Sequence, residues 1–329
     1  MNNNILEVKN LTTCFMVEKN KIKAVDDVSF NLKRGKVLGI VGESGCGKSM
    51  TAMSILGLIE SQKGFIENGE VLFNGKDLLS LDKADLNNIR GNDITMIFQE
   101  PMIALNPVLK IKDQVGEVLK VHKHIVGEEN RQMVLKMLKL VGIKRREEIL
   151  NSYPHQLSGG MCQRVMIAMA LICTPKLLIA DEPTTALDVT VQAQVLDLIN
   201  HIKDSFDMSV LFITHDLGVI CEVADEVMVM YAGKVVERAI VNDIFDKPKH
   251  PYTIGLMNSR PENFKRGELP KCIKGKVPKL NELPLGCDFY DRCECAKNIC
   301  KTNKPKLQRV GDEHQVSCFL YDLKVGGEI

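Results

Sequence analysis

The sequence predicts an α/β protein with a mainly parallel sheet that is covered by helices on both faces. Three observations lead to this prediction. A glycine-rich motif at Gly42–Ser49 lies between an apolar strand and a helix. Apolar strands then alternate with helical stretches along much of the chain. Polar side chains follow the ends of several strands, which is where α/β folds place ligand groups.

The first element is a phosphate-binding loop. Residues Gly42–Ser49 fit the pattern G-x-x-x-x-G-K-[ST], with the apolar run Val37–Val41 before them and a predicted helix, Met50–Ile59, after them. Glycines let backbone N–H groups approach an anion, and the helix N-terminus directs further N–H groups toward it. Lys48 would contact the β- and γ-phosphates, and the Ser49 hydroxyl would bind Mg²⁺. We therefore expect nucleotide binding here.

Short strands are expected over residues 5–32, with a polar turn at Glu18–Lys23. Phe15 lies just before this turn, where its ring could stack on adenine or could be a core residue on a strand face. Gly64–Leu72 followed by Asn74-Gly75 predicts a hairpin with a tight turn. The stretch from Ile111 to Leu150 has apolar residues at helical spacing and predicts a mostly helical insert.

Four candidate site residues follow later predicted strands. Gln99 comes after Ile94–Phe98, Asp181 and Glu182 end an apolar strand that begins at Leu177, and His215 follows Val210–Thr214. Each of these residues alone is more often structural. Together with a phosphate loop they form the set that a nucleotide hydrolase needs.

In that set, Asp181 would hold Mg²⁺ directly or through water, and Glu182 would orient or deprotonate the attacking water. Gln99 would complete the Mg²⁺ shell and sense the γ-phosphate, and His215 would bond to that phosphate. Ser158, Gly159 and Gly160, which open the apolar helix Val165–Leu171, suggest a further anion site. Taken alone, a Ser-Gly-Gly sequence often only caps a helix.

Composition limits the class of protein. The chain has 329 residues, a net charge of +1, 45% hydrophobic and 26% charged residues, which is typical of a globular protein and gives no support for a nucleic-acid binder. Met1–Asn4 shows no charged and apolar leader, so we expect no secretory signal. The apolar run Val165–Cys173 is too short for a membrane helix. We expect a cytosolic protein that another protein would have to hold at any membrane.

The eleven cysteines are unevenly distributed, which suggests a separate C-terminal module. Six lie in the last fifth of the chain: Cys272, Cys287, Cys293, Cys295, Cys300 and Cys318. Soft thiolates in groups of four suit zinc or an iron–sulfur cluster, although structural zinc sites usually have closer pairs. Only Cys293 and Cys295 are close, and one intervening residue is a poor chelating spacing, so Cys295 is taken as the spare. Free thiols in a loop-rich tail remain a third possibility.

The motifs in combination resemble those of ATP-binding subunits of ATP-binding-cassette (ABC) transporters. Leu157–Met161 resembles the signature Leu-Ser-Gly-Gly-Gln, with Met161 in place of Gln. Ala186–Asp188 resembles the loop after the Walker B strand, and His215 resembles the switch histidine. This resemblance covers residues 5 to about 240.

The resemblance implies an ABC-type ATPase domain over residues 1–255, with an antiparallel β-subdomain and a helical subdomain at about 105–170. Two such domains would pair head to tail, with each ATP between Gly42–Ser49 of one and Ser158, Gly159 and Gly160 of the other. The implied catalytic residues are Glu182, His215 and Gln99. The implied Mg²⁺ ligands are Ser49, Gln99 and Asp181. The implied ATP contacts are Phe15, Gly42, Ser44, Gly45, Cys46, Gly47, Lys48, Ser49 and Met50.

From Val235 onward the chain resembles the oligopeptide and dipeptide importers of this family. That likeness is carried by Pro248–Thr253, Leu283–Cys287, Arg292-Cys293, Cys300 and His314–Cys318. In addition, Ser54–Ile59 resembles the first of the two ATPases of such importers. The resemblance implies a C-terminal module over residues 256–329. It also implies a [4Fe-4S] cluster on four cysteines, with zinc as the alternative: Cys287, Cys293, Cys300 and Cys318. Because no electron partner is evident, we expect a structural role for the cluster.

The function implied is ATP hydrolysis that energises import of di- and oligopeptides, from the cytoplasmic face of the cell membrane. The implied partners are a second ABC ATPase in a hetero- or homodimer, two membrane permease subunits and an extracellular peptide-binding protein, but no nucleic acid. A nickel-importer ATPase of the same subfamily and a soluble ABC ATPase or redox sensor are the alternatives.

Overall fold

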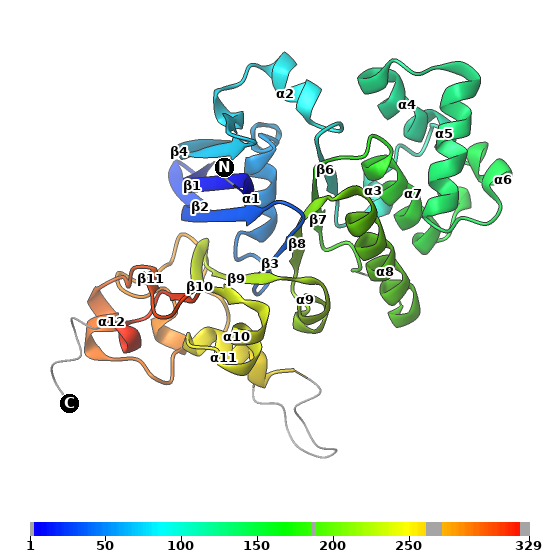
Figure 1. Ribbon diagram of the computed structural model, residues 1–329. Coiled ribbons are helices and arrows are strands. Elements are labelled where there is room, and N and C mark those ends of the chain that lie inside the picture. Colours follow the sequence, from blue (N-terminus) through cyan, green and yellow to red (C-terminus); the bar gives the residue numbers. More distant parts are fainter. Residues whose placement is uncertain (1–2, 186–187, 261–271, 323–329) are drawn as a thin grey trace. The chain divides into compact units, whose positions relative to one another are not determined.

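The computed structural model describes residues 3–185, 188–260 and 272–322 (Figure 1). The chain divides into two compact units. Unit 1 comprises residues 1–5, 32–36 and 80–213, and unit 2 comprises residues 6–31, 37–79 and 214–329. The predicted boundary between residues 255 and 256 stays a prediction, but the cysteine-rich tail and the phosphate loop belong to the same compact unit.

Unit 1 contains three parallel strands: β6 (Ile94–Ile97), β7 (Leu177–Asp181) and β8 (Ser209–Thr214). β7 pairs with β6 on one side and with β8 on the other, so that Ala180 lies between Ile97 and Phe212. β7 and β8 are buried along their whole length, which is why they are continuous apolar runs rather than alternating ones. The expected parallel strands are confirmed here.

Helices make up most of the remainder of unit 1. The predicted helical insert is present as α4, α5 and α6, whose buried side chains include Leu119, Val134 and Leu138. The helices of this unit are α2 (Lys83–Ile89), α3 (Pro101–Ala104), α4 (Ile111–Lys123), α5 (Gly127–Leu140), α6 (Arg146–Leu150), α7 (Gly159–Leu171) and α8 (Val189–Phe206).

Unit 2 holds most of a four-stranded sheet in the order β2-β1-β4-β5, in which β4 pairs antiparallel with both β1 and β5. Its strands are β1 (Asn4–Val17), β2 (Asn20–Lys33), β4 (Gly64–Phe73) and β5 (Lys76–Asp77). The tight turn between β4 and β5 has positive φ angles at both Asn74 (50°) and Gly75 (80°). This is the hairpin that the Asn-Gly pair predicts.

The phosphate-loop strand, β3 (Val37–Val41), also lies in unit 2 and pairs in parallel with β9 (Glu226–Tyr231). β10 (Lys234–Ile240) continues the sheet antiparallel to β9. Two short strands from the cysteine-rich tail, β12 (Gln315–Val316) and β11 (Gln308–Arg309), then extend its edge. The helices of this unit are α1 (Lys48–Ile55), α9 (Leu217–Val223), α10 (Val241–Asp246), α11 (Pro251–Asn258) and α12 (Asn298–Thr302).

The helix after the phosphate loop is shorter than predicted, because α1 ends at Ile55 and not at Ile59. Gly57 adopts a left-handed conformation with φ of 61°. The N–H of Leu58 donates to the carbonyl of Met53 at 2.8 Å, which closes the helix end as a Schellman motif does. The apolar pattern continued past the end, and the glycine stops the helix.

A buried carboxylate fixes the tail to β10. Glu237 is fully buried and accepts hydrogen bonds from the N–H groups of Lys249 (2.7 Å) and His250 (2.9 Å). Its Oε1 also lies 2.6 Å from Nε2 of His314, next to β12. Burial lowers the pKa of His250 to about 3, so this ring is neutral at neutral pH. The tail is therefore part of the core of unit 2.

Among the described residues, no helix is both long and apolar enough to cross a bilayer.

Candidate nucleotide site and cysteine pocket

The phosphate loop depends on glycine at two positions where the backbone is crowded. A Cβ on Gly42 would lie 2.3 Å from the carbonyl oxygen of Met230 and 2.7 Å from Sγ of Cys46. A Cβ on Gly47 would lie 2.5 Å from the carbonyl oxygen of Ala24, and its φ of 102° is in the region that favours glycine. The loop conformation therefore excludes side chains where the pattern requires glycine.

Lys48 lies within this loop. Its side chain is 5% exposed, and Nζ donates to the carbonyls of Gly42 at 2.7 Å and Glu43 at 3.2 Å. α1 begins at the same residue, so an ammonium group and a helix N-terminus meet at one place. This combination attracts phosphate oxygens. Ser44 and Gly45 are exposed at the loop tip, and Ser49 and Met50 are half-buried in the first helical turn.

Cys46 is a buried filler of the loop. Its side chain is fully buried, and burial raises the pKa of the thiol. The Cys46 thiol is therefore protonated at neutral pH. Cys46 is separate from the cysteines of the tail.

Phe15 lies on β1 opposite Gly64 of β4. A Cβ on Gly64 would lie 2.7 Å from the Phe15 ring, so the glycine leaves room for this ring on the strand face. The ring is half-buried. Stacking on adenine stays a prediction.

The predicted catalytic carboxylate, Glu182, follows the last residue of β7 in unit 1. Its φ is 47°, an unusual value for a residue other than glycine, and its N–H donates to the carbonyl of Ile213 at 2.8 Å. Its Oε2 accepts hydrogen bonds from Gln99 Nε2 at 3.0 Å and from Thr185 Oγ1 at 2.9 Å. The structure thus brings Gln99 and Glu182 together, and Asp181, which directly precedes Glu182, is buried with 3% exposure.

This geometry suits a general base. Left-handed conformations of ordinary residues cost about 1–3 kcal/mol and concentrate at functional sites. The hydrogen bonds that Gln99 and Thr185 donate to Oε2 fix the direction of the Glu182 carboxylate. A carboxylate oriented in this way can accept a proton from a water molecule.

The signature residues lie at the start of α7. Ser158 caps this helix, with Oγ accepting from the N–H of Met161 at 3.3 Å. Ser158 and Gly159 are exposed, and a Cβ on Gly159 would meet no atom within 4 Å. Gln163 Nε2, further along α7, donates to the carbonyl of Pro183 at 2.6 Å, one residue after Glu182. The signature helix and the catalytic turn are thus joined inside unit 1.

Two other predicted site elements are His215 and the loop at Ala186–Asp188, and the structure describes this loop only in part. His215 is exposed and follows β8, and the next residue, Asp216, caps α9 by accepting from the N–H of Gly218 at 2.8 Å. Ala186 and Leu187 lie outside the described residues. Asp188 caps α8, with Oδ1 accepting from the N–H of Val191 at 3.0 Å.

Five tail cysteines line one small pocket, together with apolar and aromatic side chains such as Phe289 and Phe319. These cysteines are Cys287, Cys293, Cys295, Cys300 and Cys318. Cys295 is the exposed member, whereas the other four are half-buried. Cys272 is exposed and does not line the pocket.

Three thiols of this pocket have a raised pKa, those of Cys287, Cys293 and Cys318. Burial, reinforced by neighbouring cysteines, raises the pKa of Cys287 to about 12 and that of Cys318 to about 11. Within the described ranges, no group of three or more His, Cys, Asp or Glu side chains is arranged to hold a metal ion. As a donor set, several thiols with apolar walls fit a soft metal centre, which would have to displace their protons.

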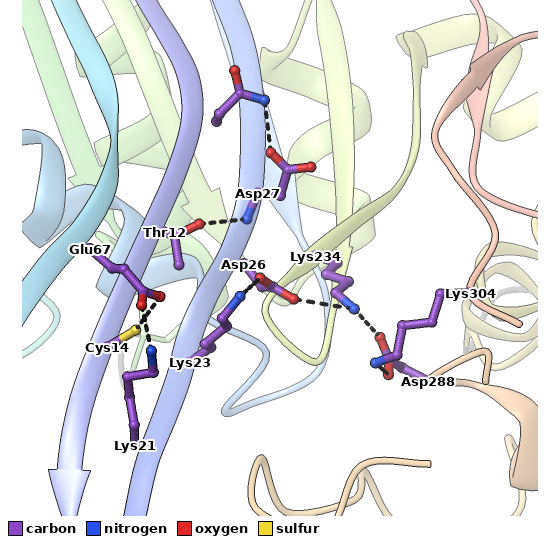
Figure 2. Close-up of polar contacts among 11 residues, drawn as sticks. Thr12, Cys14, Lys21, Lys23, Asp26, Asp27, Glu67, Lys234, Asp288 and Lys304 are labelled. Atoms are coloured by element: carbon purple, nitrogen blue, oxygen red, sulfur yellow. Dashed lines mark hydrogen bonds and ion pairs between the residues drawn. The ribbon is translucent and has the colours of Figure 1, made fainter. Parts of the chain in front are cut away.

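Two ion-pair sites join the tail to the strands around the phosphate loop. Figure 2 shows the first, a chain of contacts from β2 to the tail. Asp26 on β2 pairs with Lys234 at 3.3 Å, and Lys234 pairs with Asp288 at 2.8 Å. Asp288 directly follows Cys287 and also pairs with Lys304 at 2.8 Å (Figure 2).

The second ion-pair site reaches the phosphate loop itself. Arg292, which directly precedes Cys293, donates two hydrogen bonds to the carboxylate of Glu43. Tyr252 Oη accepts from the N–H of Glu43 at 2.8 Å. The sequence analysis did not identify this contact. The sequence feature that could have indicated it is Glu43, an acidic residue within a predicted anion-binding loop. A partly buried carboxylate in such a loop needs a cation nearby.

Comparison with protein families gives two matches. Residues 25–185 match the family described as ABC transporter. Residues 236–300 match the family described as oligopeptide/dipeptide transporter, C-terminal region.

Curated relatives match along nearly the whole length. The oligopeptide transport ATP-binding protein AppD of Bacillus subtilis (strain 168) is 52% identical over 320 residues, which is 97% of each chain. The dipeptide transport ATP-binding protein DppD of the same organism is 49% identical and covers 97% of this chain and 96% of its own. Among solved structures, a dimeric ATP-binding cassette in a post-hydrolysis state with ADP and Pi matches with a TM-score of 0.64 and 30% identity, over 72% of this chain and 98% of its own.

Proposed function

The chain belongs to the family of ATP-binding subunits of oligopeptide and dipeptide ABC transporters, and we propose that it couples ATP hydrolysis to the import of short peptides. Two findings support the proposal. The phosphate loop combines the buried Lys48 ammonium with a helix N-terminus. The relatives named for oligopeptide and dipeptide transport match from end to end, including the region that carries the cysteines.

In this proposal, the residues of unit 2 bind the nucleotide. Lys48 and the N–H groups of the loop hold the phosphates, Ser49 binds Mg²⁺, and Phe15 stacks on the base. His215 contacts the γ-phosphate. Lys48 neutralises phosphate charge without taking part in covalent chemistry, as in other phosphoryl-transfer sites.

The residues of unit 1 supply the hydrolytic chemistry. Asp181 and Gln99 complete the Mg²⁺ shell, and Glu182 takes a proton from the attacking water. The observation that supports Glu182 as the base is its backbone φ of 47° together with the two hydrogen bonds to its Oε2.

The proposed partner for hydrolysis is a second ABC ATPase. Ser158 and Gly159 are exposed at the start of α7, where a phosphate group of a partner's ATP can approach their N–H groups. Two permease subunits would carry the peptide through the membrane, an extracellular binding protein would deliver it, and this chain would act at the cytoplasmic face.

The cysteine pocket is proposed to hold a [4Fe-4S] cluster on Cys287, Cys293, Cys300 and Cys318. The donor set supports this assignment, because Cys295 is the exposed member of the five and the other four are half-buried. Such a cluster would cross-link the loop-rich tail, whose described strands and helix α12 are short.

The test is transport by the assembled complex. The chain is co-expressed with its candidate permeases, reconstituted in vesicles with the binding protein, and ATP hydrolysis is measured with di- and oligopeptides or with Ni²⁺. We expect peptides to stimulate hydrolysis. Stimulation by Ni²⁺ alone would instead identify a nickel importer, and a chain that copurifies with no membrane subunit would contradict the transport role.

A further inference from the structure

The ion pair between Arg292 of the tail and Glu43 of the phosphate loop is bidentate, which is the strongest geometry for an arginine–carboxylate pair. Arg292 Nη1 lies 2.7 Å from Glu43 Oε2, and Nη2 lies 3.0 Å from Glu43 Oε1. Two parallel hydrogen bonds fix both direction and distance, which a lysine in the same place could not do. The partners are 249 residues apart in the sequence. The contact therefore exists only because the tail folds back onto the loop.

The pair is withdrawn from solvent on the arginine side. The Arg292 side chain is 5% exposed and that of Glu43 is 31% exposed. Arg292 Nε donates to the carbonyl of Lys274 at 2.9 Å, and the guanidinium lies 5.8 Å from the centre of the Tyr231 ring. An arginine held in this way cannot turn away to solvent. Removing it would leave the Glu43 carboxylate without its counter-charge.

Glu43 is the first variable residue of the loop, and the structure holds it at three groups: its N–H, its carbonyl and its carboxylate. Its N–H donates to Tyr252 Oη at 2.8 Å, and its carbonyl accepts from Lys48 Nζ at 3.2 Å. Its carboxylate is held by Arg292. A change at the carboxylate is thus transmitted through one residue to Lys48.

Charge gives the pair a role beyond packing. The loop is an anion site, and a carboxylate at its edge would repel phosphate groups unless a cation cancels it. We propose that Arg292 is a positioning residue of the nucleotide site: it neutralises Glu43 and fixes the first residue of the phosphate loop, so that the tail forms part of the site. This rests on the proposed binding of ATP phosphates at Gly42–Ser49.

The second ion-pair site supports the same role for the tail. Asp288 pairs with Lys234. Gly233, the residue before Lys234, donates its N–H to the carbonyl of Cys46 in the phosphate loop at 2.9 Å. The two tail residues that reach the loop region, Asp288 and Arg292, each adjoin a cysteine of the pocket. Both contacts therefore lie directly beside cysteines of the pocket in the chain.

The test measures the dissociation constant of Mg-ATP for the full chain by equilibrium dialysis, because binding separates this role from turnover. Arg292→Met should weaken binding about tenfold, by leaving Glu43 charged and unpaired. Glu43→Gln in the Arg292→Met background should restore most of the affinity. Raising the salt from about 0.05 to about 0.5 M should shrink the Arg292→Met defect, because salt screens repulsion.

Two control variants make the result specific. Lys304→Met removes another cation of the tail that pairs with Asp288, and it should change the dissociation constant less than about twofold. Lys48→Ala tests the proposed nucleotide site itself. If Lys48→Ala binds like the unaltered chain, the proposed site fails. If Lys48→Ala loses binding while Arg292→Met keeps it, or if the double variant stays as weak as Arg292→Met, the present proposal alone is wrong.

If Arg292→Met does not fold, the unaltered chain still decides the question. Coupling between two sites is reciprocal. If the contact between Arg292 and Glu43 favours ATP binding, then bound ATP must also stabilise that contact. Saturating Mg-ATP should slow hydrogen exchange of the Arg292 amide, whose N–H donates to the carbonyl of Phe289 at 3.1 Å, and peptide mass spectrometry measures this exchange. The amides of α5, in unit 1, serve as the internal reference. Equal exchange of the Arg292 amide with and without ATP would overturn the proposal.

Discussion

The phosphate loop and the cysteine pocket lie in the same compact unit, yet they are held together in different ways. The loop is one continuous stretch between β3 and α1, and its shape depends on glycines and on bonds such as Lys48 Nζ to the Gly42 carbonyl. The pocket gathers cysteines from Cys287 to Cys318 through short turns and strands. Its shape depends on distant contacts, above all those of Glu237 on β10.

Because the two regions are held together differently, we expect mutations in them to have different effects. Changes at the residues proposed for catalysis should alter nucleotide chemistry and leave the tail folded. Changes in the tail should alter metal content and local stability first, and nucleotide affinity only through Arg292. The following predictions test that division, from the largest expected effect to the smallest.

The largest effect is expected at Glu182. Glu182→Gln removes the proposed base but keeps a side chain of the same size, so ATP should still bind while turnover falls by about 10²- to 10⁴-fold. Mg-ATP binding and phosphate release on the same preparation provide the measurement. Turnover at the unaltered rate would exclude Glu182 as the base. An unchanged metal content of the tail would support the division between the two regions.

The next effect concerns the cysteine pocket. After anaerobic purification, we expect the unaltered chain to contain iron and to absorb visible light. Cys287→Ser should lose both, because it removes a half-buried donor of the proposed cluster, whereas the matched variant at the exposed cysteine, Cys295→Ser, should keep both. Zinc in place of iron would correct the identity of the metal. Equal loss in both variants would contradict the assignment of Cys295 as the spare.

The two regions also differ in how far the sequence alone could predict them. The loop was predicted residue by residue, because its requirements are local and its spacing is fixed by the covalent chain. The parallel strands β6, β7 and β8 were predicted from continuous apolar runs. The end of α1 was predicted four residues too late, because the apolar pattern continues past the point where Gly57 turns the chain.

For the tail, the sequence identified the cysteines that could bind a metal but did not predict the fold around them. Nothing in the spacing of the cysteines indicates that β12 joins the sheet beside β10. The pair between Arg292 and Glu43 was invisible for the same reason, since contacts across such a separation depend on the whole fold. Gln99 and Glu182 were easier, because both follow parallel strands whose carboxyl ends meet at one edge.

Removing the carboxylate that anchors the tail should have an intermediate effect. Glu237→Ala leaves the buried N–H groups of Lys249 and His250 without their acceptor, which should destabilise the tail locally by about 3 kcal/mol. Hydrogen exchange of the β12 amides measures this opening. Glu222→Ala, at an exposed position on α9, is the control and should leave the exchange unchanged. Unchanged β12 protection in Glu237→Ala would mean that other contacts hold the tail.

The smallest effect is expected at Asp26, on β2 (Figure 2). Burial acts to raise the pKa of Asp26, but Lys23 and Lys234 outweigh burial, and the pKa is lowered. A lowered pKa in the folded chain adds stability at pH values above the unfolded pKa of about 3.9, and that stability disappears as the pH falls through the folded value. All three side chains are partly exposed, so the contribution at pH 7 should be below about 1 kcal/mol.

Denaturant unfolding of the unaltered chain and of Asp26→Asn measures that contribution. The difference in unfolding free energy should be present at pH 7, shrink below about pH 4 and be reduced by salt. Asp197→Asn, at an exposed position on α8, should show no such difference. A difference that persists in acid would show that Asp26 acts through hydrogen bonding rather than charge. In that case the contact of Asp26 with Lys23 and Lys234 would act through hydrogen bonds, and the pair between Arg292 and Glu43 would be the link to the loop for which these variants test charge.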